Sequence, residues 1–198
     1  MSDPYNEDLE RNPANFQPLT PLTFLERAAS VFPQNTAIIH GNLRRSYAEF
    51  YARSRQLASA LTQHHVGRGD TVSVMLANTP AMLECHYGVP MCQAVLHAIN
   101  TRLDAAVIAF QLDHAEAKIV IVDREFMPMM QDALERTTVK PLLIQYDDPE
   151  YDGRAGTSLS LLRSYMEQLL FKVVMPMVTR RDTSVRWLAT FVSRRHYA

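Results

Sequence analysis

The sequence has little glycine and little cysteine, and it contains no long apolar run. Six glycines and eleven prolines among 198 residues exclude collagen-like chains, Gly/Ser linkers and proteins built on glycine-rich loops. The two cysteines, Cys85 and Cys92, indicate a reduced intracellular chain rather than a disulfide framework. The polar start carries no signal segment, and no stretch of about 18 residues is apolar. The sequence therefore predicts a cytoplasmic protein without a membrane span.

What the sequence does contain is a globular composition with unevenly distributed charge. Hydrophobic residues make up 47% of the chain and charged residues 21%, which predicts a folded core at this length. The net charge of −1 combines −7 in residues 1–153 with +6 in residues 154–198. A basic tail could bind nucleic acid or a lipid surface, but the aromatic residues in it are few and irregularly spaced. We therefore expect no nucleic-acid partner.

Local signals at the start of the chain predict an arm, a helix, a hairpin and a second helix. Residues 1–20 read as an extended arm, and Thr20-Pro21 is typical of a helix start because proline needs no N–H partner there. Gly41-Asn42 predicts the turn of a β-hairpin. Ser46 and Glu49 fit a capping box, which predicts a helix running to about residue 64.

Beyond residue 70, short apolar runs alternate with helical patterns. Strands are predicted at 71–75, 94–96, 118–122 and 142–144. Helices are predicted from Thr79-Pro80, from Asp104 as N-cap and over about 125–136. This alternation is typical of a parallel sheet with helices on both faces, so we expect an α/β, Rossmann-like fold over about residues 36–145. One more helix is predicted over 158–170, and the periodicity is lost after Leu170.

No constellation of residues supports a catalytic, cofactor-binding or metal assignment on its own. The acids of the segment 147–152 could hold a hard cation, but they lack calcium-loop spacing, and a solvated acidic turn is favoured. Gly67-Arg68-Gly69 lacks a third glycine and precedes a strand, so a tight turn explains it. Gly156-Thr157-Ser158 has no nearby lysine and fits a helix N-cap region. The histidines and cysteines lack metal spacing and are interpreted as partly satisfied or buried residues: His64, His65, His86, His97, Cys85 and Cys92.

A run of phrases resembles the N-terminal portion of AMP-forming acyl-CoA synthetases, in the adenylate-forming ligase superfamily. The resemblance covers residue 12 to about residue 170, and it is strongest toward the branch that activates short- and medium-chain acids, including methylthiopropionate-type substrates. One residue departs from the expected pattern: Gln93 stands where we expect glycine, which puts the local turn in doubt. The phrases are residues 12–21, 24–29, 69–74, 78–80, 86–91, 94–96, 99–103 and 112–118.

The resemblance implies a two-step ligase that forms an acyl adenylate from a carboxylic acid and MgATP and then an acyl-CoA. ATP, Mg²⁺ and coenzyme A are implied for the full-length family and none is assigned to this chain. The family's Thr/Ser/Gly-rich phosphate loop ending Pro-Lys-Gly, its adenine and ribose motifs and its C-terminal lysine cannot be placed on this sequence. We therefore expect a fragment that is inactive alone. The alternative is a small Rossmann-like module that binds a nucleotide or acyl ligand without turnover.

The expected organisation has three parts. Residues 1–20 form the arm, residues 21–170 a partial ligase N-terminal domain, and residues 171–198 a basic tail unlike the family and poorly ordered. Back-translation of residues 171–178 in another frame permits a phrase resembling the family's acidic Gln-Gly-x-Asp-Ala-Asp-Gly. The hypothesis is that residues 171–198 are a frameshifted reading.

Overall fold

The computed structural model describes residue 16 and residues 20–148. The expected arm and basic tail therefore lie outside the described residues, apart from Phe16 and Thr20. In chain order the elements are α1 (Pro21–Val31), β1 (Thr36–His40), β2 (Leu43–Ser46), α2 (Tyr47–Gln63), β3 (Thr71–Met75), α3 (Pro80–Met91), β4 (Val95–Ala98), α4 (Ala105–His114), β5 (Ala117–Asp123), η1 (Arg124–Phe126), α5 (Met127–Arg136) and β6 (Leu142–Tyr146). Among these helices, none has the length and apolar character needed to cross a bilayer.

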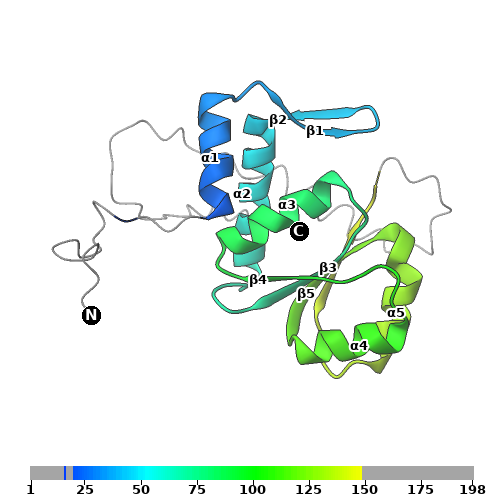
Figure 1. The fold of residues 1–198 in the computed structure, drawn as a ribbon. Helices are drawn as coiled ribbons and strands as arrows, with labels where there is room; N and C mark the ends of the chain where they lie inside the picture. The colour runs from blue at the N-terminus through cyan, green and yellow to red at the C-terminus, as the bar shows by residue number, and fades with distance from the viewer. Residues whose placement is uncertain (1–15, 17–19, 149–198) are drawn as a thin grey trace, which may run out of the picture.

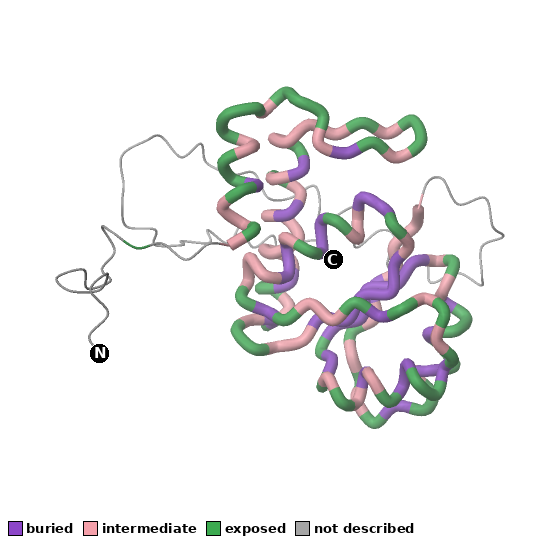
Figure 2. Tube along the Cα trace, in the orientation of Figure 1, coloured by how far each residue is buried: buried purple, intermediate pink, exposed green. Residues whose placement is uncertain are grey.

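The central sheet has four parallel strands in the order β4-β3-β5-β6. Helices α4 and α5 pack on one face, where Ile108 and Met130 meet Val120. Helices α2 and α3 cover the other face, where Leu61 and Val89 meet neighbouring strand side chains. Figure 1 shows these two layers, and Figure 2 shows the buried residues concentrated in the strands between them. The predicted α/β fold with a parallel sheet and flanking helices is confirmed.

A smaller unit made of α1 and the β1–β2 hairpin packs on α2, away from the central sheet (Figure 1). Leu25 of α1, Ile38 of β1 and Phe50 of α2 form its core, and the Phe50 ring meets the Tyr87 ring edge-on, with 5.1 Å between the ring centroids. The hairpin strands are antiparallel, as the Gly41-Asn42 turn predicts.

The helix starts follow the capping signals of the sequence. Thr20 caps α1 by accepting from the Leu22 N–H at 3.3 Å. The capping box of α2 is complete: the Ser46 N–H donates to Glu49 Oε2 at 2.7 Å, and the Glu49 N–H donates to Ser46 Oγ at 3.3 Å. Each of these pairs satisfies backbone donors that a helix start leaves open.

The helix predicted over 125–136 begins later than expected. Residues 124–126 form a 3₁₀ turn, and α5 starts at Met127. Asp123 caps this turn by accepting from the Glu125 N–H at 3.3 Å, and Pro128, which has no N–H to donate, stands at the start of α5. The Asp123 cap and Pro128 lie so close together in sequence that the pattern does not distinguish a turn followed by a helix from one continuous helix.

The turn between α3 and β4 adopts the backbone conformation that favours glycine. Gln93 has φ = 64°, while its carbonyl accepts from the Gly69 N–H at 3.2 Å. A left-handed conformation costs a non-glycine residue about 1–2 kcal/mol. Glycine avoids this cost, but it also raises the conformational entropy of the unfolded chain, which offsets part of the gain in stability. The turn therefore forms with glutamine at position 93, but its backbone is strained.

We expect Gln93→Gly to raise the free energy of unfolding by about 0.5–1 kcal/mol, because it relieves this strain. The control is Gln63→Gly in the last turn of α2, where glycine is expected to destabilise by about 0.5 kcal/mol. Urea unfolding of both variants measures the difference. Equal effects of the two substitutions would contradict the strain at Gln93.

Helices α2 and α3 pack closely at Gly88. A Cβ there would lie 2.9 Å from the Ser54 carbonyl oxygen and 2.9 Å from Leu57 Cδ2. Backbone cannot yield as a flexible side chain does, so Gly88→Ala is expected to destabilise by about 1–3 kcal/mol despite the better helix propensity of alanine. Gly67→Ala is the control, since a Cβ at Gly67 meets nothing within 4 Å. Thermal unfolding of Gly88→Ala at the wild-type temperature would refute the close approach.

Candidate functional site at the carboxyl edge of the sheet

The order of the strands locates the place where a ligand would be expected. From β3 the chain crosses to β4 on one side, and from β4 it returns across β3 to β5 on the other. The carboxyl ends of β3 and β5 therefore flank a topological switch point, and open α/β sheets bind ligands in the crevice outside such a point. The loop 76–79 and the turn η1 start there.

A pocket of about 380 Å³ lies beside this point, between strand β1 and the start of α3. Its walls combine apolar side chains with the imidazoles of His40 and His86 and the amide of Asn78. The Nδ1 of His86 lies 2.9 Å from the Met82 carbonyl oxygen, so one nitrogen of that ring is already engaged. The lining residues are Ala37, Ile38, Ile39, His40, Asn78, Thr79, Pro80, Met82, Leu83 and His86.

Asp123 is a buried acid at the carboxyl end of β5. Only 1% of its surface is exposed. Burial raises its pKa to about 6, the negative charges of Asp148 and Glu125 add to the rise, and the Glu125 N–H and Arg124 oppose it. Asp123 can therefore hold or release a proton near neutral pH.

Tyr146 ends the neighbouring strand β6. Burial raises its pKa to about 12, and the nearby carboxylate of Asp148 adds to the effect. Its phenol therefore stays protonated at neutral pH. Asp123, which pairs with Tyr146 across the two strands, has the much lower pKa of about 6. The carboxyl end of the sheet therefore holds a buried carboxyl group and a partly buried phenol.

A histidine–aspartate contact joins the hairpin to this edge of the sheet, and further polar contacts lie along the edge itself. His40 Nε2, at the end of β1, lies 2.9 Å from Asp148 Oδ1. Arg124 Nε lies 3.9 Å from Asp147 Oδ1, and the Gln145 side-chain amide donates to the same oxygen at 2.8 Å. The two aspartates after β6 are therefore engaged with protein partners.

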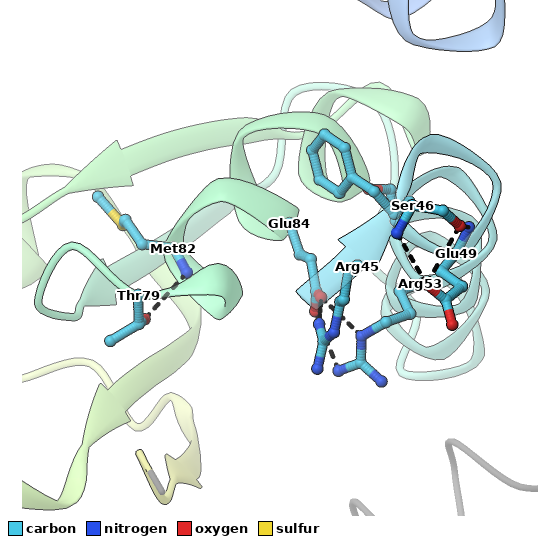
Figure 3. A network of polar contacts seen from close by, with 9 residues as sticks. Arg45, Ser46, Glu49, Arg53, Thr79, Met82 and Glu84 are labelled. Carbon is cyan, nitrogen blue, oxygen red and sulfur yellow. Dashed lines mark hydrogen bonds and ion pairs between the residues drawn. The ribbon is translucent and has the colours of Figure 1, made fainter. Parts of the chain in front are cut away.

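A third group of charges lies between the hairpin, α2 and α3. Glu84 of α3 accepts from Arg45 Nη1 and, at 2.6 Å, from Arg53 Nε (Figure 3). Glu84 is 6% exposed, so this carboxylate is held almost entirely by the two guanidinium groups. The network joins α3, which contributes one wall of the pocket, to β2 and α2.

The residues that the sequence raised as metal candidates do not gather in the described part of the chain. No group of three or more His, Cys, Asp or Glu side chains there could hold a metal ion. Asp147 and Asp148 are paired as above, while Glu150 and Asp152 lie outside the described residues. Burial raises the pKa of the Cys85 thiol to about 12, so it stays protonated.

Of the two other candidate motifs, the structure describes one. Gly67-Arg68-Gly69 forms the expected turn: Gly69 has φ = 84°, and the Gly67 N–H donates to Asp70 Oδ2 at 2.9 Å. That N–H is therefore engaged by a carboxylate rather than open to a phosphate. Gly156-Thr157-Ser158 lies outside the described residues. The Gly67-Arg68-Gly69 turn thus does not fit the phosphates of ATP.

Sequence reasoning missed Asp123 and the Arg45–Glu84–Arg53 network. The available signal was a charge in an apolar setting: Asp123 ends an almost wholly apolar strand, and Glu84 lies between Leu83 and Cys85. Neither pattern predicts which residue, remote in the sequence, the charged side chain would contact.

Comparison with known proteins agrees with the geometry. A family model described as AMP-binding enzyme matches residues 25–168. The peroxisomal acetate/butyrate–CoA ligase AAE7 of Arabidopsis thaliana is 44% identical over 160 residues, covering 75% of this chain and 28% of that protein. The acetate–CoA ligase CCL3 of Humulus lupulus is 48% identical over 155 residues, covering 75% of this chain and 27% of that protein. The chain thus spans under a third of the length of these curated relatives.

Solved structures show the same fold. The N-terminal domain of FACL13 from Mycobacterium tuberculosis is 27% identical with a TM-score of 0.59, covering 63% of this chain and 33% of that one. The anthranilate CoA ligase AuaEII, at 18% identity and a TM-score of 0.63, covers 69% of this chain and 27% of that one and is similar in fold. The chain belongs to the AMP-binding enzyme family, and it corresponds to an N-terminal portion of an adenylate-forming acid–CoA ligase.

Proposed function

We propose that this chain supplies part of the N-terminal domain of an AMP-forming ligase that joins a short-chain carboxylic acid to coenzyme A. The observation that carries the proposal is the family match over residues 25–168, together with relatives named as acetate, acetate/butyrate and benzoate–CoA ligases at 44–48% identity. In such a reaction the acid attacks the α-phosphate of ATP, and the acyl adenylate then passes its acyl group to the thiol of coenzyme A.

The described residues contribute a scaffold and one polar wall to this reaction. The sheet presents Asp123 and Tyr146 at its carboxyl edge, and the Glu84 network joins α3 to β2 and α2. Adenylation also needs donors that stabilise the developing charge on the phosphates, and losing one such donor typically costs about 100- to 1000-fold in rate. No Pro-Lys-Gly sequence occurs in the 198 residues. The chain alone is therefore proposed to produce no acyl-CoA.

Two assays test the proposal from opposite directions. The purified chain, mixed with ATP, magnesium, coenzyme A and acetate, butyrate or benzoate, is expected to release no AMP above a protein-free control. A chimera carrying residues 25–168 in place of the matching segment of the Humulus lupulus acetate–CoA ligase is expected to make acetyl-CoA. The same chimera with Gly88→Leu, which drives a side chain into α2, is the inactive control. A folded chimera without activity would refute the ligase role, and acid-dependent AMP release by the chain alone would refute its inactivity.

The alternative of a binding module without turnover rests on the pocket beside β1. A rise in melting temperature with ATP or butyrate, in the absence of AMP release, would support it. Only the ligase proposal predicts that the chimera makes acetyl-CoA, so this assay distinguishes the ligase from a binding module.

The frameshift of residues 171–198 is also a proposal. The family match ends at Gln168, in agreement with a break near residue 170. A relative from Arabidopsis thaliana, named as probable acyl-activating enzyme 6, aligns with 92% of this chain at 37% identity and so extends beyond residue 170. The downstream DNA read in all three frames decides: a continuation resembling the family in another frame supports the frameshift, and its absence refutes it.

Cytoplasmic location is proposed as well, supported by Cys85 and Cys92, which are both free thiols. The name of the acetate/butyrate–CoA ligase of Arabidopsis thaliana places that protein in the peroxisome. A fluorescent fusion in the source cell distinguishes the two compartments, and a peroxisomal pattern would refute the proposal.

A further inference from the structure

Arg45 and Arg53 converge on a single carboxylate. Arg45 Nη1 and Arg53 Nε both donate to Glu84 Oε1, and Arg53 Nη2 donates to Glu84 Oε2 at 3.2 Å. Figure 3 shows the two guanidinium groups on the same side of Glu84, close to each other. The three side chains come from β2, α2 and α3, so the arrangement is built by the fold rather than by neighbours in sequence.

The charges at this point do not balance. Within residues 20–148, no acid other than Glu84 forms an ion pair with either guanidinium group. Glu49 also attracts Arg45 electrostatically, but its Oε2 already accepts from the N–H and the hydroxyl of Ser46. Burial lowers the pKa of Arg45, and the positive charge of Arg53 lowers it further against the attraction of Glu84. Two cations thus share one anion where solvation is incomplete.

The two arginines also keep unused hydrogen-bonding capacity. A guanidinium group offers five N–H donors in a planar fork, and three contacts to Glu84 engage only part of the ten. The side chains of Arg45 and Arg53 are 17% and 28% exposed, so part of each side chain reaches solvent. Such forks match the oxygens of carboxylate and phosphate groups.

We propose that Arg45 and Arg53 form a binding site for a small oxyanion, a carboxylate or a phosphate group, which takes the donors that Glu84 leaves open. The site shares helix α3 with the pocket, which Leu83 lines. It does not depend on the proposed ligase activity, since it uses only charges and donors of the described residues.

Nuclear magnetic resonance titration of the full ¹⁵N-labelled chain tests this site. Inorganic phosphate and, separately, butyrate are added at constant ionic strength with chloride as the balancing anion. Saturable shifts of the Arg45 and Arg53 side-chain N–H signals are expected. Saturation by phosphate alone identifies a tetrahedral oxyanion, saturation by butyrate alone identifies a carboxylate, and either supports the site.

Arg53→Gln is expected to weaken binding about tenfold, the value of one charge-assisted hydrogen bond. Arg55→Gln is the matched control: it lies on the same helix, its guanidinium carbon is 5.4 Å from the centre of the Tyr51 ring, and it is expected to bind like wild type. Shifts that do not saturate, or equal affinities of Arg53→Gln and wild type, would overturn the proposal.

Glu84→Gln separates a binding role from a purely structural one. The variant loses the internal anion, so an added oxyanion should replace part of what was lost. We expect phosphate or butyrate to raise the melting temperature of Glu84→Gln more than that of wild type at the same concentration. Equal rises in the two proteins would contradict the site, and this measurement holds even where the variant is less stable.

Discussion

Glu84→Gln is expected to lower the free energy of unfolding by about 3 kcal/mol. Removing one partner of a buried ion pair leaves the other charge uncompensated, which typically costs about 3–5 kcal/mol. The lower end applies because Arg45 and Arg53 still reach solvent through 17% and 28% of their side-chain surface. In a domain of this size the loss corresponds to a fall in Tm of about 6–12 °C, which scanning calorimetry measures.

The control for this prediction is Glu135→Gln in the last turn of α5. Glu135 is exposed, and substitutions at such positions usually change stability by less than about 0.5 kcal/mol. If Glu84→Gln behaves like Glu135→Gln, the three-element network is screened by solvent and does not hold α3 to β2 and α2.

Asp123→Asn is expected to stabilise the protein above about pH 6, by about 1–3 kcal/mol for a shift of this size. The pKa of Asp123 is raised in the folded state from 3.8 to about 6. Its contribution to stability is therefore fully present below about pH 4 and is lost as the pH rises through about 6. Asparagine cannot ionise, and its side-chain oxygen can still accept from the Glu125 N–H. Urea unfolding of variant and wild type between pH 4 and pH 8 should show the difference growing with pH.

Asp70→Asn provides a control of opposite sign. Lys118, 2.8 Å from Asp70, and the Gly67 N–H lower the pKa of this carboxyl. Its contribution to stability is present at neutral pH and is lost as the pH falls through the lowered pKa, so the variant should be weakened only at the higher pH values. A constant difference between Asp123→Asn and wild type across the whole range would show that Asp123 does not titrate as the structure implies.

Nearly all of the described fold could be predicted from the sequence, because the signals that specify it are local. Thr20-Pro21 and the Ser46–Glu49 box act within four residues, and β3, β5 and β6 of the central sheet each carry an apolar run. At Gln93, where a glycine was expected, the sequence put the turn in doubt, and the structure keeps the turn with a positive φ.

The candidate site could be predicted far less well, because its contacts join residues remote in sequence. Glu84 is 39 positions from Arg45, and His40 is 108 positions from Asp148. The charge of such a residue is visible in the sequence, but its partner depends on how α3 and the hairpin lie against the end of the sheet. The raised pKa of Asp123 likewise depends on its burial in the folded protein and on the charge of Asp148, which no local pattern predicts.

The strand order also has a consequence for how the chain is made. Strand β3 is paired on both sides in the finished sheet, with β4 and with β5. Since β5 lies some forty residues later than β3 in the sequence, the ribosome releases Val72 and Val74 well before their second partner exists. Non-local parallel pairing is slow to form, and an unpaired apolar strand can join another chain. During synthesis, β3 therefore lacks its second partner, and can pair with another chain, until residue 123 has emerged.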